Sequence, residues 1–329
     1  MIQLQTKTVR QGINKAYLKV NVKRADLDAF KEKATAYLNN LAQAEGKDEE
    51  HHKAYLRDFL KDTFYSKEER LVNTSRNVDL GIYSGKTTSS TLEVIIEAKK
   101  PDNTREMISK DDPNAKALQE ALLYYFEERE AGNEDLKQVV ITNYTEFFLF
   151  DAQEIERNFY SKKALVNTFN QWKTDKKVSS NTKFMYSKFG EFIKDSDANL
   201  SAVYVDLSKF KKDLEVPASE KDDKKLIPLY KLFSPEHLVK KPFANDSNSL
   251  DKRFYNEFLH ILGLQEVKEK GSRLIQRLPQ KDRQSGSLIE STIDILKYGQ
   301  HMSEVREATV QYGDEEDDQL FGVALELVI

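Results

Sequence analysis

One short segment, residues 92–96 (Leu-Glu-Val-Ile-Ile), most constrains the fold because a largely apolar run turns abruptly into charged residues. Its β-branched side chains favour a buried strand, and Glu97, Ala98 and Lys99 follow directly. Side chains alternate along a strand, so Glu97 and Lys99 point to one face of a sheet and Ala98 to the other. The segment predicts a strand that runs from a buried sheet interior to a polar rim.

A second acidic residue, Asp79, lies in an earlier predicted strand, residues 78–83, with a parity opposite to that of its apolar neighbours. Two adjacent strands can bring Asp79, Glu97 and Lys99 to one point. Mg²⁺ prefers oxygen ligands, typically one or two carboxylates plus phosphate, so Asp79, Glu97 and the Ala98 carbonyl suit it. This arrangement is typical of a metal-dependent nuclease, where Lys99 orients or helps deprotonate the attacking water.

The Glu-x-Lys pattern alone is weak evidence, because 32% of the residues are charged. It also occurs at residues 45–47 and 266–268, neither of which follows an apolar strand. A solvated ion pair at a strand end explains the pattern equally well, since paired surface charges are common and stabilise little. The strands around Asp79 and Glu97 are what favour the nuclease interpretation.

Several further segments carry a resemblance to a known family. Residues 77–80, 97–101, 114–125, 139–143 and 146–152 resemble the PD-(D/E)XK endonuclease region of fused Type IIG restriction-modification enzymes. Residues 12–19, 58–65, 243–262 and 286–296 are similar to the same family, and residues 162–223 match least. The resemblance implies that Asp79, Glu97 and Lys99 are catalytic and that Gln119 is a helix glutamine beside them. It implies a Mg²⁺ cofactor and double-stranded DNA as substrate. One nuclease centre cuts one strand at a time, so we expect a transient homodimer when both strands are cut.

The composition limits which kinds of site, cellular location and partner the protein can have. The chain has no cysteine and five scattered histidines, which excludes disulfides and thiolate metal sites and gives no sign of zinc. It has no long apolar stretch and no signal-peptide core, so we expect a cytoplasmic protein without a membrane partner. The net charge of −4 on the whole chain disfavours binding to nucleic acid. DNA binding depends on a local basic face, however, so the net charge does not exclude it.

The first 24 residues provide such a face, since they contain six basic residues and no acidic one. We expect Lys15, Lys19 and Lys23 to contact DNA phosphates, together with Lys100 beside the predicted site. A solvated surface is the alternative explanation for the basic run.

The order of predicted elements indicates an α/β fold with a mixed sheet flanked by helices, and the resemblance implies that this sheet is of the restriction-endonuclease type. Helices are expected at residues 25–41, 51–65 and 114–129, and strands at 71–74, 78–83, 91–99, 136–143 and 146–151. We place a domain boundary near residue 175, so that residues 1–175 form the endonuclease domain with an N-terminal helical segment. Residues 176–329 are then a mostly helical connector.

Residues 319–329 are strongly apolar, and the resemblance implies that this segment leads on to a methyltransferase domain absent from this chain. The chain itself contains no Asn-Pro-Pro-Tyr motif and no P-loop. The sequence thus predicts a Mg²⁺-dependent endonuclease, the cleavage half of a fused restriction-modification enzyme. A catalytically inactive nuclease-like scaffold is the alternative, and a nuclease of DNA repair or of a Type I restriction system is a weaker one.

Overall fold

The computed structural model describes residues 2–304 except 45, 47, 75–77, 175–180, 217–219, 244–251, 270–271 and 285. The chain forms two compact units, Met1–Asp246 and Ser247–Ile329. The apolar segment 319–329 lies outside the described residues, so the prediction drawn from it is not tested by the fold.

The first unit is built on a mixed seven-stranded sheet with the order β1-β7-β6-β5-β4-β3-β2. β1 is parallel to β7 and β4 is parallel to β5, whereas the other neighbours are antiparallel. The strands are β1 (Gln3–Lys7), β2 (Leu71–Asn73), β3 (Leu80–Tyr83), β4 (Leu92–Ala98), β5 (Gln138–Thr142), β6 (Glu146–Asp151) and β7 (Asn199–Asp206). This confirms the predicted mixed sheet.

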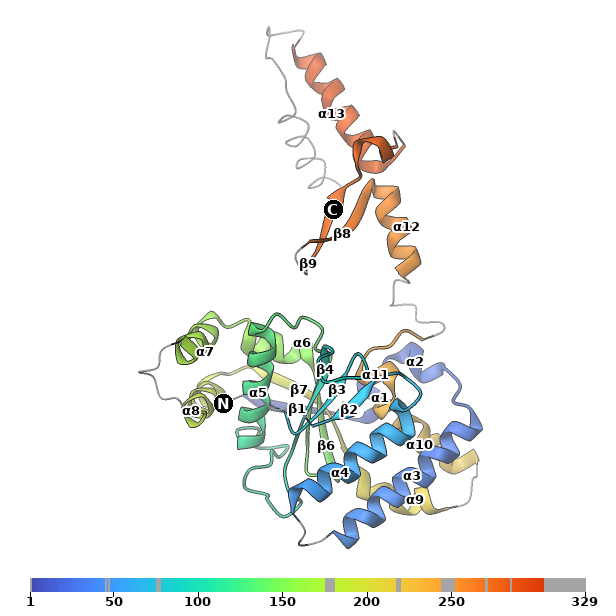
Figure 1. The fold of residues 1–329 in the computed structure, drawn as a ribbon, viewed down its shortest axis with the longest axis vertical. Helices are drawn as coiled ribbons and strands as arrows, with labels where there is room; N and C mark the ends of the chain where they lie inside the picture. The colour runs from blue at the N-terminus through green and yellow to red at the C-terminus, as the bar shows by residue number, and fades with distance from the viewer. Residues whose placement is uncertain are drawn as a thin grey trace. The chain divides into compact units, whose positions relative to one another are not determined.

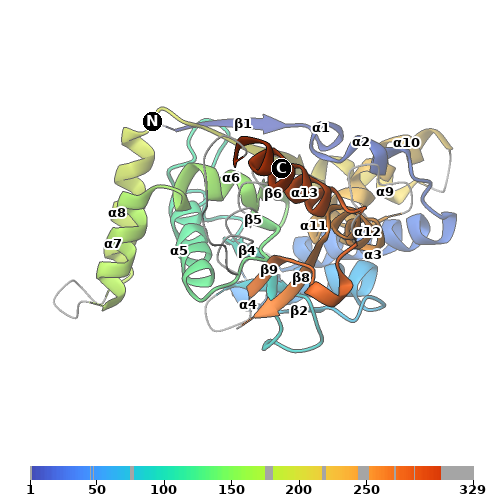
Figure 2. The same ribbon diagram turned by 90° about the horizontal axis from the view of Figure 1, so that it is seen from above.

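Helices cover both faces of the sheet, as Figure 1 and Figure 2 show. One face packs on α3 (Arg24–Gln43), α4 (Glu49–Leu60) and α10 (Glu220–Phe233), and the other on α5 (Lys116–Glu130) and α8 (Lys183–Asp195). The remaining helices of this unit are short or peripheral: α1 (Val9–Gly12), α2 (Lys15–Lys19), η1 (Lys61–Tyr65), α6 (Ala152–Ile155), η2 (Glu156–Tyr160), α7 (Lys163–Thr174), η3 (Leu207–Phe210), α9 (Lys211–Glu215) and α11 (Pro235–Leu238).

The predicted boundary near residue 175 falls inside this unit. β7 lies beyond it, yet it pairs with β6 and with β1 and so completes the sheet. Residues 175–182 connect α7 to α8, and these two helices contact each other. A polar break in the sequence here joins two helices of one layer and does not separate two domains.

The connection from β4 through α5 to β5 positions the polar end of β4. A helix that joins two parallel strands runs back along them, so its first turn lies near the end of the preceding strand. α5 therefore begins near Ala98. β3 begins at Leu80, two residues later than the predicted strand, and this leaves Asp79 in the bend that enters it.

The second unit contains α12 (Lys252–Leu262), the antiparallel hairpin of β8 (Leu264–Glu269) and β9 (Ser272–Arg277), η4 (Gln280–Asp282) and α13 (Leu288–Glu304). Leu259, Leu264 and Ile293 are among its buried core residues. The hairpin was not predicted for this region. No helix within the part of the chain that the structure describes is long and apolar enough to cross a membrane.

Candidate active site

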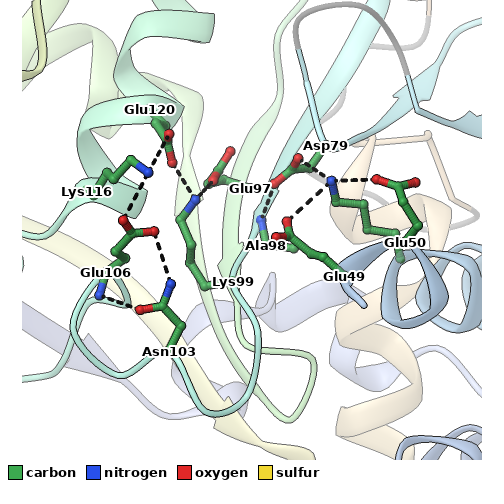
Figure 3. Close-up of polar contacts among 11 residues, drawn as sticks. Glu49, Glu50, Asp79, Glu97, Ala98, Lys99, Asn103, Glu106, Lys116 and Glu120 are labelled. Carbon is green, nitrogen blue, oxygen red and sulfur yellow. Dashed lines mark hydrogen bonds and ion pairs between the residues drawn. The ribbon is translucent and has the colours of Figure 1, made fainter. Parts of the chain in front are cut away.

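Two carboxylates meet at the polar end of β4 (Figure 3). Glu97 is only 1% exposed, and its Oε2 has no hydrogen-bond partner among the described residues. Asp79 approaches from the bend before β3, where its Oδ2 accepts the Ala98 N–H at 3.1 Å. The predicted convergence of Asp79 and Glu97 is therefore present, with one buried oxygen left unpaired.

The environment of Glu97 disfavours its charged form. Burial raises the pKa of the Glu97 carboxyl well above its usual value, and the nearby Asp79 charge raises it further. Lys99 opposes both effects through its charge and its hydrogen bond, without reversing the shift. A carboxyl group whose pKa is shifted in this way by its surroundings is a common feature of catalytic and metal-binding sites.

Lys99 lies on the same face as Glu97, as the strand alternation predicts. Its ammonium donates to Glu97 Oε1 at 2.6 Å and also to Glu120 Oε2, a residue of α5. Desolvation works to lower the pKa of Lys99, but the charges and hydrogen bonds of Glu97 and Glu120 outweigh it and raise that pKa. Lys99 is consequently a cation at neutral pH. This favours an orienting and charge-stabilising role over deprotonation of water.

Glu120 connects Lys99 to a second ion-pair group (Figure 3). Lys116, one turn earlier on α5, lies 3.6 Å from Glu120 and 3.0 Å from Glu106. Glu106 in turn accepts a hydrogen bond of 3.1 Å from Asn103. The first turn of α5 and the loop after β4 are thus joined by alternating charges around Lys99.

On the other side of the site, α4 supplies a cation to Asp79. Lys53 Nζ lies 2.7 Å from Asp79 Oδ1, 3.3 Å from Glu49 and 3.2 Å from Glu50. Desolvation tends to lower the pKa of Lys53, but the Asp79 hydrogen bond and charge, with the two glutamates, raise it. Asp79 is therefore held by Lys53 through one oxygen and by Ala98 through the other.

Sequence reasoning missed Glu120 and Lys53. Their only local signals are the (i, i+4) pairs that they form with Lys116 and Glu49 on their own helices, and such pairs are frequent on helix surfaces. Neither signal points to a site without the fold.

Gln119, which the family resemblance places beside the catalytic residues, makes its hydrogen bond elsewhere. Its Nε2 donates to Asn114 Oδ1 at 3.1 Å, and Asn114 donates to the Gly190 carbonyl of α8 at 3.1 Å. A Cβ on Gly190 would stand 3.1 Å from that Gln119 amide. The observed contacts of Gln119 thus fasten α5 to α8, and the adjacent Glu120 is the α5 residue that reaches Lys99.

The predicted DNA-binding lysines fall into two places. Lys15 and Lys19 are exposed on α2, and Lys23 is exposed just before α3. α2 is docked on α11 through the Tyr17 hydroxyl, which bonds Ser234 and Glu236. None of the described contacts joins these lysines to the Asp79–Glu97 site.

Lys100, by contrast, lies at the site end of the sheet. The pKa of Asp48 is lowered chiefly by its hydrogen bonds with His51, and the charge of Lys100 contributes to the shift. Asp48 is the N-cap of α4. Lys100 is therefore near the start of α4, the helix that also supplies Lys53.

The donor atoms at this site are suited to a hard divalent cation. Mg²⁺ is commonly held by one or two carboxylates together with water and phosphate, and the unpaired Oε2 of Glu97 and the carboxylate of Asp79 match that need. Ala98 contributes an observed N–H contact to Asp79, while its carbonyl remains a predicted ligand. No group of three or more His, Cys, Asp or Glu side chains with metal-binding geometry occurs among the described residues.

Comparison with protein families finds two matching domain models, both of unknown function. The model of a domain of unknown function, DUF7149, matches residues 7–246, and that of another, DUF7814, matches residues 247–329. The chain belongs to the DUF7149 family. No curated protein and no solved structure matches the chain significantly. The DUF7149 match ends where the first compact unit ends and contains every residue of the site.

Proposed function

We propose that this DUF7149 protein is a Mg²⁺-dependent DNA endonuclease of the PD-(D/E)XK type, acting as the cleavage half of a fused restriction-modification enzyme. The observation that carries the proposal is the unpaired, buried Oε2 of Glu97 beside Asp79, with the Lys99 ammonium on the same face. Buried polar atoms without a partner are rare in folded proteins, so each one needs an explanation such as an absent ion or a catalytic role.

Each side chain has a distinct part in the proposed reaction. Asp79 and Glu97 would hold Mg²⁺, which when bound neutralises charge on the scissile phosphate and lowers the pKa of a coordinated water. Lys99, fixed by Glu97 and Glu120, places a positive charge where negative charge develops on the phosphate. Its raised pKa keeps this charge in place at neutral pH.

The substrate of the proposed reaction is double-stranded DNA. The exposed lysines of α2 and Lys23 would bind phosphates away from the site, and Lys100 would bind them next to it. Such contacts position a protein and carry no direct sequence information. We therefore expect this chain to cut without sequence preference, and a transient homodimer is needed if both strands are to be cut together.

The test is nicking of supercoiled plasmid by the protein in Mg²⁺ or Mn²⁺. Asp79→Asn and Lys99→Met should each reduce the nicking rate at least ~100-fold, because a loss of about 3 kcal/mol of transition-state stabilisation corresponds to that factor. Glu69→Gln, which removes an exposed carboxylate paired with Lys86, is the matched control and should retain the wild-type rate.

DNA affinity distinguishes the proposal from the scaffold alternative. All four proteins should bind DNA to a similar extent, since the variants alter the site and leave the basic surface intact. DNA binding without any metal-dependent nicking by the wild-type protein would instead support a nuclease-like scaffold. Nicking that persists in Asp79→Asn would rule out this site.

A further inference from the structure

Lys53 occupies a position on Asp79 that a metal ion would need. The Asp79 carboxylate has two oxygens: Oδ2 accepts the Ala98 N–H, and Oδ1 is 2.7 Å from Lys53 Nζ. Backbone strand geometry fixes the first contact, because Ala98 is the last residue of β4. The contact that can be exchanged is the one with Lys53.

A second pair of acceptors is ready for the Lys53 ammonium. Glu49 and Glu50 precede Lys53 by four and three residues on α4, and their carboxylates already lie 3.3 Å and 3.2 Å from its Nζ. If Lys53 leaves Asp79, it stays paired with these two glutamates. The exchange therefore avoids leaving an uncompensated charge in a place where the Lys53 side chain is only 13% exposed.

We propose that Lys53 is an internal counterion that competes with the divalent cation for Asp79 and moves onto Glu49 and Glu50 when the metal binds. This inference rests on the proposed function and extends it to the regulation of metal loading. In the metal-free protein Lys53 holds Asp79 in place beside Glu97. The cation concentration needed for loading is raised by the work of releasing Lys53.

The arrangement around Lys99 is different, and the difference supports a specific role for Lys53. Lys99 bridges Glu97 and Glu120, which lie on different elements, so it ties β4 to α5. The alternative partners of Lys53 are on its own helix, where a rotation of one side chain is sufficient for transfer. Only the Lys53 contact therefore works as a low-cost exchange.

The experiment measures Mn²⁺ binding to the whole chain by calorimetry, without DNA, for wild type, Lys53→Gln and Lys53→Met. Removal of the competitor should tighten Mn²⁺ binding by roughly three- to tenfold, as expected for a partly buried ion pair worth about 1 kcal/mol. Lys53→Arg keeps the competing charge and should bind Mn²⁺ like wild type. The two neutral variants are used together so that a folding defect in one leaves the test intact.

Lys116→Gln is the charge-matched control. It removes a cation from the same group of acidic residues, but Lys116 contacts Glu106 and Glu120 and makes no contact with Asp79. If Lys53 acted only by adding positive potential, Lys116→Gln would tighten Mn²⁺ binding to a similar degree. Direct competition predicts a clearly smaller effect for Lys116→Gln.

The possible outcomes separate this inference from the proposed function. If wild type binds Mn²⁺ through Asp79 and nicks DNA, but both neutral Lys53 variants bind with equal or weaker affinity, the competition is disproved and the nuclease proposal stands. If wild type and Asp79→Asn show the same Mn²⁺ binding, the metal site itself is absent and both proposals fall. Tighter binding in the neutral variants, abolished by adding Asp79→Asn, supports the competition.

Discussion

Replacing Glu97 by glutamine is expected to stabilise the metal-free protein while abolishing its cleavage of DNA. Glu97 is almost fully buried, and its Oε2 has no hydrogen-bond partner among the described residues. A buried polar atom left without a partner costs about 1–3 kcal/mol. Glutamine has nearly the same shape, can still accept from Lys99 through its oxygen, and presents an amide donor near the negative Asp79.

The pH dependence of this stabilisation has a definite sign. The pKa of Glu97 is raised in the folded state, first by burial and then by Asp79. A carboxyl with a raised pKa stabilises the fold at low pH, and this contribution is lost as the pH rises through the folded-state pKa. The free energy of unfolding of Glu97→Gln should accordingly exceed that of wild type only slightly near pH 5, and this difference should grow to about 1–3 kcal/mol at pH 8.

Urea unfolding in the presence of a chelator, at pH 5 and pH 8, measures the difference. Glu93→Gln is the matched control, because Glu93 is also buried on β4 but is fully paired with Arg70 at 2.8 Å. That substitution should destabilise the protein. The reasoning is refuted if Glu97→Gln is less stable than wild type at pH 8, or if its advantage is the same at both pH values.

Three further predictions concern other parts of the first unit. Burial lowers the pKa of His237 from 6.5 to about 4, so the fold loses stability as the pH falls through this range. The loss between pH 8 and pH 5 should be about 2 kcal/mol smaller in His237→Gln than in wild type, by urea unfolding. Lys231 is buried and donates to three backbone carbonyls at the end of α2, at 2.6, 3.0 and 2.6 Å. Lys231→Met should therefore lower the free energy of unfolding by about 3 kcal/mol, and a decrease below 1 kcal/mol would contradict this account. Changing Lys15, Lys19 and Lys23 together to alanine should flatten the slope of log K for DNA against log salt by about 2 to 3 units, and an unchanged slope would mean that these residues do not meet phosphates.

Strands β2 to β6 and the core of the site were predictable from local sequence patterns, whereas β1 and β7 were not predicted. Alternation along β4 fixes which face Glu97 shares with Lys99, because the period of a strand is two residues. The hydrogen bond between Lys99 and Glu97 follows from that parity. Asp79 was also identified, although the strand after it begins one residue beyond it.

The partners from the helices were not predictable in the same way. Whether Gln119 or Glu120 faces β4 depends on the rotation of α5, and adjacent residues on a helix differ by about 100°. Packing against α8 decides this rotation, since Gly190 leaves room for Gln119 and Asn114 on that side. The predicted boundary near residue 175 lies inside the first unit for a related reason: pairing of β7 with β1 joins segments about 200 residues apart, and composition along the chain does not record such pairing.

The charges around the site suggest how metal and DNA binding would support each other. Asp79, Glu97 and Glu120 lie around the ammonium groups of Lys53 and Lys99, and Glu49 and Glu50 add two more carboxyl groups beside Lys53, so acidic groups outnumber basic ones at the metal-free site. On our proposal, metal loading requires that Lys53 leave Asp79. A divalent cation then brings two positive charges next to Asp79 and Glu97. A phosphodiester carries a single negative charge and is attracted to the bound cation, so by linkage DNA should tighten metal binding by the same factor that metal tightens DNA binding.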